Sequence, residues 1–217
     1  MSITKKGVKR QYGIEPGLVL WLPFDGDVRD YSGNSNHGLN YGASWTTGKI
    51  GGALSFNGVD NYINCGSAPS LDDLTTFTYS FWLKSNLLNQ NGISLSKKFW
   101  WSRIENDDKF RMNISAATTA ADTKTTQTIG TSAWKHIVMT FDNSGDRKIY
   151  IYINGAESAY DNQTAAVGAL TSDAANSLWI GKYYDGQYPF KGVIDEVRIY
   201  NRALIAAEIW DLYQRGL

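Results

Sequence analysis

Oxygen-bearing side chains are concentrated in residues 25–36, which contain three aspartates, two asparagines and two serines, interspersed with glycines. A calcium ion binds about six to eight hard oxygen atoms from carboxylates, amides, backbone carbonyls and water. A short, glycine-containing stretch with this many oxygens therefore indicates a calcium loop. The same residue types also build turns, because Asp and Asn side chains accept hydrogen bonds from nearby backbone N–H groups. The sequence leaves both interpretations open.

Aromatic residues cluster at two places, residues 99–101 and 183–188, near segments that the sequence indicates as loops. Aromatic rings offer sugars and other ligands a rigid, apolar platform. If both tryptophans of the first cluster lie on a strand, alternation turns one of them outward. The alternative is that these rings fill a core, as most Trp and Tyr side chains on strands do. The predicted ligand-binding residues are Trp101, Tyr183, Tyr184 and Asp185.

Length, charge and cysteine content limit the class of protein that positions these residues. The chain has 217 residues, a formal net charge of zero and one cysteine, Cys65. A neutral chain has no global field that favours nucleic acid or an anionic membrane. A lone cysteine cannot form an internal disulfide, so the chain does not need an oxidising compartment. No apolar run reaches the length of a membrane-spanning helix.

Basic residues crowd the start of the chain, where Lys5, Lys6, Lys9 and Arg10 occur without an acidic residue. No apolar stretch follows them, so a signal peptide is not predicted. Residues 1–16 are predicted to form a basic N-terminal arm, and residues 17–217 the folded domain. Such an arm is either a frayed terminus or a segment that docks on a neighbouring subunit.

Strand patterns recur along the domain. Apolar residues alternate in 77–83 and 134–141, and residues 148–153 precede Asn154-Gly155, which favours a type I′ hairpin. Residues 115–132 and 156–176 are rich in Thr, Ala and Ser, and we expect loops or weak edge strands there. Further strands are predicted at 18–24, 53–56, 62–65, 92–96, 100–104, 110–114, 178–181 and 193–200.

One helix is predicted near the C-terminus, over residues 203–214. Ile205, Ile209 and Leu212 fall on one face at helical spacing, and Gly216 follows as a stop signal. Many strands with one closing helix indicate an all-β sandwich of two antiparallel sheets rather than alternating strand–helix units.

Several phrases of the sequence, taken in order, resemble the laminin-G-like, pentraxin-like jelly-roll domains of the concanavalin A-like group. The opening phrases are LVLWLPFDG at residue 18, DYSGNSNHG at residue 30 and GKIGGALSFNGVDNYI at residue 48. Residues 77–83, 134–141 and 149–155 are similar to the family's central strands, and GVIDEVRIYNRAL at residue 192 to its last strand. The resemblance covers nearly everything after residue 17. It implies a two-sheet antiparallel jelly roll with a short C-terminal helix.

The resemblance also implies a structural calcium ion. Members of this group often hold calcium between the Asp-Ser-Gly-Asn loop and the aspartate of the last strand. Transferred by motif, the metal ligands are Asp30, Asn34, Asn36 and Asp195, and Tyr31 departs from the small polar residue found in many members. Such an ion would pin a loop to the last strand rather than react.

Catalysis is not predicted. Glycan hydrolases with this type of sandwich carry their carboxylates on one strand as Glu-x-Asp-x-x-Glu, and a retaining pair lies about 5 Å apart. The nearest match begins at Glu105, but Phe110 occupies the third position. Asp195 and Glu196 are adjacent, so on a regular strand they face opposite sides. Two isolated histidines, His37 and His136, do not have the spacing of a zinc site.

The sequence thus predicts a non-catalytic recognition or adhesion module that binds carbohydrate or another host-surface ligand. It predicts display on a virion or an extracellular location, with a cytoplasmic location as the alternative. A purely structural decoration or fibre subunit of a phage particle is the second hypothesis, and a glycan hydrolase or lyase the third. The basic arm would mediate a capsid, tail or self-association contact. Neither nucleic acid nor membrane insertion is expected.

Overall fold

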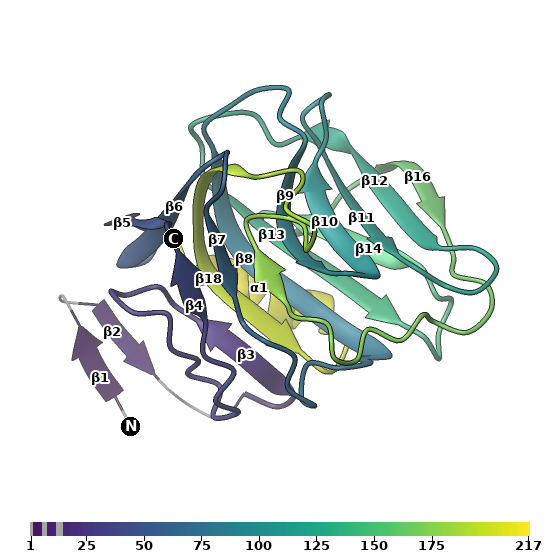
Figure 1. Ribbon diagram of the computed structural model, residues 1–217, viewed down its shortest axis with the longest axis horizontal. Helices are drawn as coiled ribbons and strands as arrows, with labels where there is room; N and C mark the ends of the chain where they lie inside the picture. Colours follow the sequence, from purple (N-terminus) through teal and green to yellow (C-terminus); the bar gives the residue numbers. More distant parts are fainter. Residues whose placement is uncertain (1, 6–7, 12–14) are drawn as a thin grey trace.

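The computed structural model describes residues 15–217 and, before them, the backbone of two strands, β1 (Ser2–Lys5) and β2 (Val8–Gln11). These two strands pair with each other in a sheet of their own. The rest of the predicted arm's first fourteen residues lie outside the described residues. The domain that follows consists of two large antiparallel sheets packed face to face, with one short helix, which confirms the predicted fold class (Figure 1).

The first sheet, here called sheet I, carries the residues of greatest functional interest. Its strands lie in the following order: β16 (Tyr160–Thr164), β12 (Ala121–Thr128), β11 (Lys109–Ile114), β10 (Trp100–Ile104), β9 (Gly92–Lys97), β17 (Trp179–Ile180), β7 (Tyr62–Asn64) and β4 (Leu39–Tyr41). Every pairing between neighbours is antiparallel.

The second sheet, sheet II, contains the longest strands. Its order is β15 (Ala156–Glu157), β14 (Ile149–Ile153), β13 (Lys135–Asp142), β8 (Thr76–Ser85), β18 (Lys191–Tyr200), β6 (Gly52–Asn57) and β5 (Ser44–Thr47), and β3 (Leu18–Leu22) also pairs with β18. The first half of β18 therefore pairs with β6 and its second half with β3.

A bulge in β18 separates those two halves. Glu196 has a φ of 55°, and the register against β8 shifts between Asp195 and Arg198. Both Asp195 and Glu196 are buried, and the alternation expected of a regular strand does not apply to them. The reason is the extra residue, which breaks the alternation at this point. The Glu196 carboxylate accepts hydrogen bonds from the Trp21 indole at 3.0 Å and from Arg198 at 2.7 Å.

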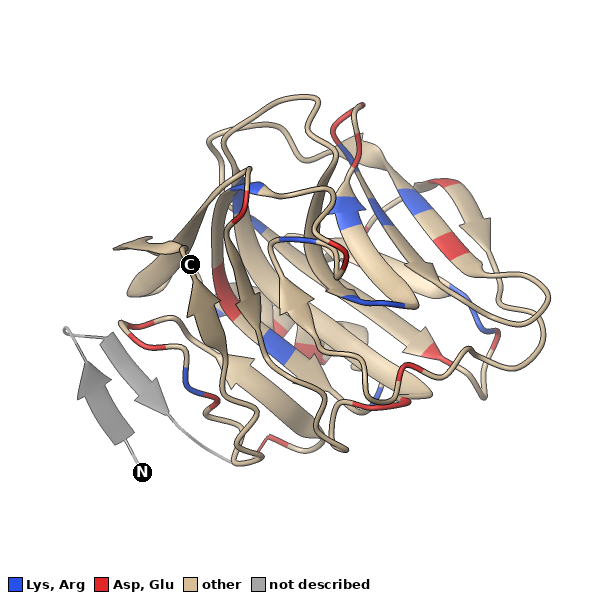
Figure 2. Ribbon diagram, in the orientation of Figure 1, with Lys and Arg blue, Asp and Glu red and all other residues tan. Residues whose placement is uncertain are grey.

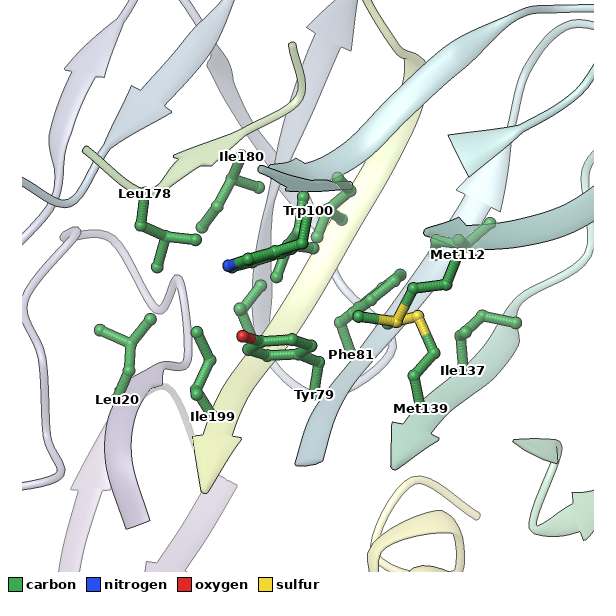
Figure 3. Close-up of a cluster of buried hydrophobic side chains, with 14 of the residues drawn as sticks. Leu20, Tyr79, Phe81, Trp100, Met112, Ile137, Met139, Leu178, Ile180 and Ile199 are labelled. Atoms are coloured by element: carbon green, nitrogen blue, oxygen red, sulfur yellow. The ribbon is translucent and has the colours of Figure 1, made fainter. Parts of the chain in front are cut away.

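The core between the sheets is built from the alternate, inward-facing side chains of both. Figure 3 shows the indole of Trp100, from sheet I, lying over the phenol of Tyr79, from sheet II, with ring centroids 4.5 Å apart. Beside them, the side chains of Met112 and Met139 meet from opposite sheets (Figure 3). This layer fixes which residues of β10 point inward.

The helix α1 (Ala206–Gln214) covers the outer face of sheet II. Ile209 and Leu212 form a second apolar cluster with residues of β3, β13 and β18. The helix begins three residues later than predicted, because Ile205 is its N-cap and the Glu208 carboxylate accepts the Ile205 N–H. The described chain has no other helix, so the outer face of sheet I has no helix over it.

One loop prediction was wrong. Residues 115–132 include β12, a strand of eight residues between β11 and β16. Its inward threonines are buried with their hydroxyls bonded: Thr123 donates to the Ile149 carbonyl at 3.0 Å, and Thr125 to the Gln127 carbonyl at 2.9 Å. Residues 156–176 do contain only edge strands, β15 and β16, as predicted.

Candidate functional site

Trp101 projects from the outer face of sheet I. Strand β10 alternates, so Trp100 is buried against Tyr79 and its neighbour Trp101 points the other way, half-buried. The sequence expectation that one of the two tryptophans faces outward is therefore confirmed. The Arg103 guanidinium lies 4.4 Å from the centre of the Trp101 ring, and that of Arg111 lies 5.8 Å away. These cations hold the indole on the sheet surface.

Glu105 anchors the arginines beside Trp101. Its carboxylate accepts Arg103 at 2.5 Å, Arg111 at 3.1 Å and Lys124 at 3.0 Å. Burial acts to raise the pKa of Glu105, but the hydrogen bonds from these three cations outweigh it and lower the pKa to about 2. The group therefore stays ionised at physiological pH, and its role is to order the cations across β10, β11 and β12.

A loop formed by residues 182–188, here called the aromatic loop, follows β17. The Tyr183 N–H donates to the Gln187 carbonyl at 3.0 Å, and the Asp185 carboxylate accepts both the backbone N–H and the side-chain amide of Gln187. The Tyr183 hydroxyl donates to the Lys98 carbonyl at 2.6 Å, in the turn between β9 and β10. Tyr183 and Asp185 thus shape the loop and fasten it to the sheet.

The aromatic loop presents two other rings to solvent. Tyr184 is 39% exposed and Tyr188 is 38% exposed. The Arg103 guanidinium, 4.4 Å from the ring centre of Trp101, lies 5.5 Å from that of Tyr188. The structure therefore brings the predicted ligand-binding residues together on one face, and it adds Tyr188. That tyrosine belongs to the aromatic run seen in the sequence, but only the fold reveals its exposure and its link to β10.

A second aromatic group on the same face was missed by the sequence analysis. Tyr41, Tyr62 and Trp179 come from three adjacent strands and stack with centroid separations of 4.5 and 4.3 Å. The ammonium of Lys182, the first residue of the aromatic loop, lies 4.6 Å from the ring centre of Tyr62. These rings are far apart in sequence and lie on very short strands. Only the pairing of β4, β7 and β17 reveals the stack.

Three of the four predicted calcium ligands lie in one tightly bonded loop. The Asp30 carboxylate accepts four hydrogen bonds, from the backbone N–H groups of Trp21, Ser32 and Asn36 and from the Ser32 hydroxyl. The side-chain amides of Asn34 and Asn36 donate to the carbonyls of Leu18 and Val19. The loop is thus tied to β3 by its own polar groups, in the manner of the turn interpretation.

The fourth predicted ligand, Asp195, contacts a different segment. Its carboxylate accepts the Ile50 N–H at 2.9 Å, and Asp25 accepts the Gly52 N–H at 2.7 Å, so both hold the turn formed by residues 48–52. Within residues 15–217, no three or more His, Cys, Asp or Glu side chains are grouped to hold a metal ion. The calcium site stays a prediction. In the same part of the chain, no helix is long and apolar enough to cross a membrane.

Solved structures with this arrangement include several sugar- and receptor-binding proteins. Domain 4 of AbnA, an extracellular arabinanase of Geobacillus stearothermophilus solved in complex with arabinotriose, is 25% identical, with a TM-score of 0.75 over 92% of this chain and 100% of that domain. The binding domain of Paraclostridial Mosquitocidal Protein 1 is 19% identical, with a TM-score of 0.73 over 91% of this chain and 52% of that one. The second likeness shows the fold alone.

Sequence comparison gives the family. A curated relative, Adhesion G-protein coupled receptor V1 of Danio rerio, is 25% identical over 154 residues, which are 65% of this chain but 2% of the receptor. Residues 57–210 match the family model described as the Concanavalin A-like lectin/glucanases superfamily, in its Laminin_G_3 form. The chain therefore belongs to that laminin-G-like family of the concanavalin A-like superfamily, as the sequence resemblance indicated.

Proposed function

We propose that the outer face of sheet I binds carbohydrate without catalysis, at the surface formed by Trp101 and the aromatic loop. The observation that carries the proposal is the exposure of Tyr184 and Tyr188 on a loop whose Tyr188 is joined to Trp101 through Arg103. Exposed rings held in place in this way provide flat platforms for the apolar faces of sugar rings. The related arabinanase domain, which was solved with arabinotriose, supports this class of ligand.

The described residues divide into platforms and supports. Tyr184 and Tyr188 are the exposed rings that would contact a sugar, and Trp101 extends the platform onto β10. The Tyr183 hydroxyl donates to the Lys98 carbonyl, and the Asp185 carboxylate accepts hydrogen bonds from Gln187. We therefore assign the last two residues to the shape of the loop rather than to direct contact.

A non-catalytic role is supported by the protonation state of Glu105, the carboxylate that binds both arginines beside Trp101. A general acid must hold a proton near neutral pH, which requires a raised pKa. The pKa of Glu105 is instead lowered to about 2, and three cations occupy its oxygens. This carboxylate is thus unsuited to proton transfer to a glycosidic oxygen.

Titration calorimetry with arabinotriose, followed by a wider glycan array, tests the proposal. We expect Tyr184→Ala and Tyr188→Ala each to weaken binding at least fivefold at unchanged Tm, taking as a guide the contribution of about 1–3 kcal/mol from one nucleic-acid base stacked on an aromatic side chain. Trp210→Ala is the matched control, because Trp210 is 49% exposed on α1, over sheet II. Full retention of glycan binding by both tyrosine variants would refute the assignment of this face.

Calcium is proposed as a structural ion at the turn 48–52 rather than at the loop that contains Asp30. The four donors to Asp30 already satisfy that carboxylate. Asp25 and Asp195 are 8% and 0% exposed and contact the same turn. Each contributes carboxylate oxygens next to this turn, and calcium takes oxygen ligands. Asp25 and Asp195 would hold the ion and pin the turn to β18.

Display on a virus or phage particle stays a prediction, as does the alternative of a structural decoration subunit. Both assign the attachment to the basic arm at residues 1–16. Deletion of residues 2–12 tests them: particle assembly should be lost while the melting temperature of the domain is kept. Unchanged particle assembly would refute the hypothesis that the basic arm attaches the domain to the particle.

A further inference from the structure

We infer that the sugar bound at this face is acidic, a residue that carries a carboxylate such as a uronic acid. The inference rests on the proposed function of the same face and specifies its ligand. The evidence comes from Lys98, which lies beside the aromatic loop, from Lys182, the first residue of that loop, and from the charges around them.

Lys98 is held in place by a strained turn. It has a φ of 37°, in the left-handed region that non-glycine residues rarely adopt, within the two-residue connection between β9 and β10. Its carbonyl accepts the Tyr183 hydroxyl at 2.6 Å. Its ammonium lies 6.0 Å from the ring centre of Tyr184 and 5.0 Å from that of Phe99. The turn therefore aims a cation at the exposed ring.

Lys182 is the first residue of the aromatic loop. Its carbonyl accepts the Ser96 hydroxyl at 3.0 Å, which fastens the start of the loop to β9. Its ammonium lies 4.6 Å from the ring centre of Tyr62 and 5.8 Å from that of Trp179. One lysine thus stands on the Tyr184 side of the loop and the other on the side of the aromatic stack.

Lys98 and Lys182 are cations of this face that no neighbouring carboxylate neutralises. Farther along the sheet, each cation has an acidic partner; these pairs join Arg103, Arg111, Lys109 and Lys124 with Glu105, Asp122, Asp107 and Asp161. Neither Lys98 nor Lys182 forms an ion pair with any carboxylate in the described part of the chain. Figure 2 shows their basic segments at the β9–β10 turn and at the start of the aromatic loop.

Asp185 is the acidic residue within the aromatic loop, and its carboxylate is bonded to Gln187. Two lysines and one aspartate give the aromatic loop and its surroundings a net positive charge, with Lys98 on the Tyr184 side. A sugar that stacks its apolar face on Tyr184 would place a ring carboxylate within reach of an ammonium group. A neutral sugar would use the two lysines only as hydrogen-bond donors, whereas an acidic sugar would also pair with their charge, so the charge pattern favours an acidic one.

The sharpest test compares one polymer with and without its charge. Binding of the purified protein is measured to polygalacturonate and to the same polymer after full methyl esterification, with heparin as a sulfated arm. We expect the charged polymer to bind more tightly, and added salt to weaken its binding more than that of the ester. Tighter binding to heparin than to polygalacturonate would refute a carboxylate as the acidic group of the ligand and indicate a sulfate instead.

Charge variants assign the effect to this face. Lys98→Gln and Lys182→Gln should each weaken polygalacturonate binding by about two- to fivefold, the range for single exposed charges, and leave binding to the ester unchanged. Asp185→Asn, which keeps an oxygen to accept the Gln187 N–H, should strengthen polygalacturonate binding. Lys191→Gln is the control, because Lys191 is exposed on β18 in sheet II.

The outcomes separate the two proposals. If arabinotriose and the esterified polymer bind as tightly as the charged one, and the lysine variants bind normally, carbohydrate binding stands and the acidic ligand falls. If the charged polymer binds through Lys98 and Lys182 even in the Tyr184→Ala variant, stacking on Tyr184 is refuted and recognition of an acidic ligand by the lysines is supported. If arabinotriose binds but neither polymer does, the acidic ligand alone is refuted; if neither arabinotriose nor any polymer binds, both proposals are refuted.

Discussion

Asp73 and Asp173 each accept the backbone N–H of the other. The Asp73 N–H donates to Asp173 Oδ1 at 2.8 Å, and the Asp173 N–H donates to Asp73 Oδ1 at 2.9 Å. Asp73 precedes β8 of sheet II and Asp173 precedes β17 of sheet I, so this pair joins the two sheets at one end of the sandwich. A cleft of about 330 Å³, lined by Trp100 and Phe77 among others, lies beside it.

Removal of the Asp173 carboxylate should destabilise the protein strongly. The group also accepts the ammonium of Lys97, which is 1% exposed, at 2.7 Å and the Trp100 indole at 2.9 Å. Loss of one partner from a buried ion pair costs about 3–5 kcal/mol, and Asp72 retains part of the pairing here. We therefore expect Asp173→Ala to lower the free energy of unfolding by about 3 kcal/mol in urea titrations.

Asp161→Ala is the control for this prediction. Asp161 pairs with Lys109 on the surface, where both side chains are partly exposed. A surface pair of this kind contributes little to stability, so the variant should unfold close to the wild-type midpoint. An Asp173 variant as stable as this control would show that the junction between the sheets does not depend on the carboxylate.

Burial of His136 should make the protein less stable at mildly acidic pH. The ring is covered by Trp82 and Tyr213, and its Nε2 lies 2.9 Å from the Ser80 hydroxyl. Burial, aided by the charge of Arg198, lowers the pKa of His136 to about 3 from an ordinary value of 6.5. Below pH 6.5, His136 binds a proton in the unfolded chain but stays neutral in the folded chain. The free energy of unfolding therefore falls as pH decreases from 6.5 toward 3.

Urea titrations at pH 6.5 and pH 5 measure this effect. One such histidine should contribute a loss of about 2 kcal/mol over the interval. His136→Gln should remove that dependence, and His37→Gln, which changes the other histidine, should keep it. A wild-type stability that is flat over the interval would contradict a neutral, buried His136.

Chelation distinguishes the two places at which calcium could bind. We expect the chelator EGTA to lower the Tm of the wild-type protein. Asp195→Asn should abolish that sensitivity, because Asp195 and Asp25 contact the turn 48–52. Asp30→Asn should lower the Tm itself, through its four lost or weakened hydrogen bonds, but keep the response to EGTA. If Asp30→Asn abolishes the response to EGTA and Asp195→Asn keeps it, the loop that contains Asp30 is the calcium site. If EGTA does not change the Tm of the wild type, neither place binds a stabilising calcium ion.

The fold could be predicted because local patterns and the global arrangement agree. Residues 77–83 alternate, and they form the centre of β8, whose neighbours β13 and β18 also showed clear patterns. Strand β12 was missed because its apolar content is low. Its buried threonines satisfy their hydroxyls through bonds to Ile149 and Gln127 that no local pattern encodes.

The site was only partly predictable for a related reason. The outward direction of Trp101 follows from alternation on a single strand. The stack of Tyr41, Tyr62 and Trp179 depends instead on which strands lie side by side, and the exposure of Tyr188 depends on where its loop crosses the sheet. Asp195, next to the bulge at Glu196, contacts the turn 48–52, and motif transfer indicated neither the bulge nor this contact.

The hydroxyl of Tyr183 should matter for binding more than for stability. It fastens the aromatic loop to the strained turn at Lys98, and so sets the position of both Tyr184 and the lysine ammonium. A single hydrogen bond contributes about 1 kcal/mol to stability, so Tyr183→Phe should lower the Tm by only about 2–4 °C. Release of the aromatic loop from the turn should weaken glycan binding by about fivefold. Tyr150→Phe, which removes a tyrosine hydrogen bond to Asp146 in sheet II, is the matched control. If both variants bind glycan as the wild type does, the loop does not depend on Tyr183 for its binding conformation.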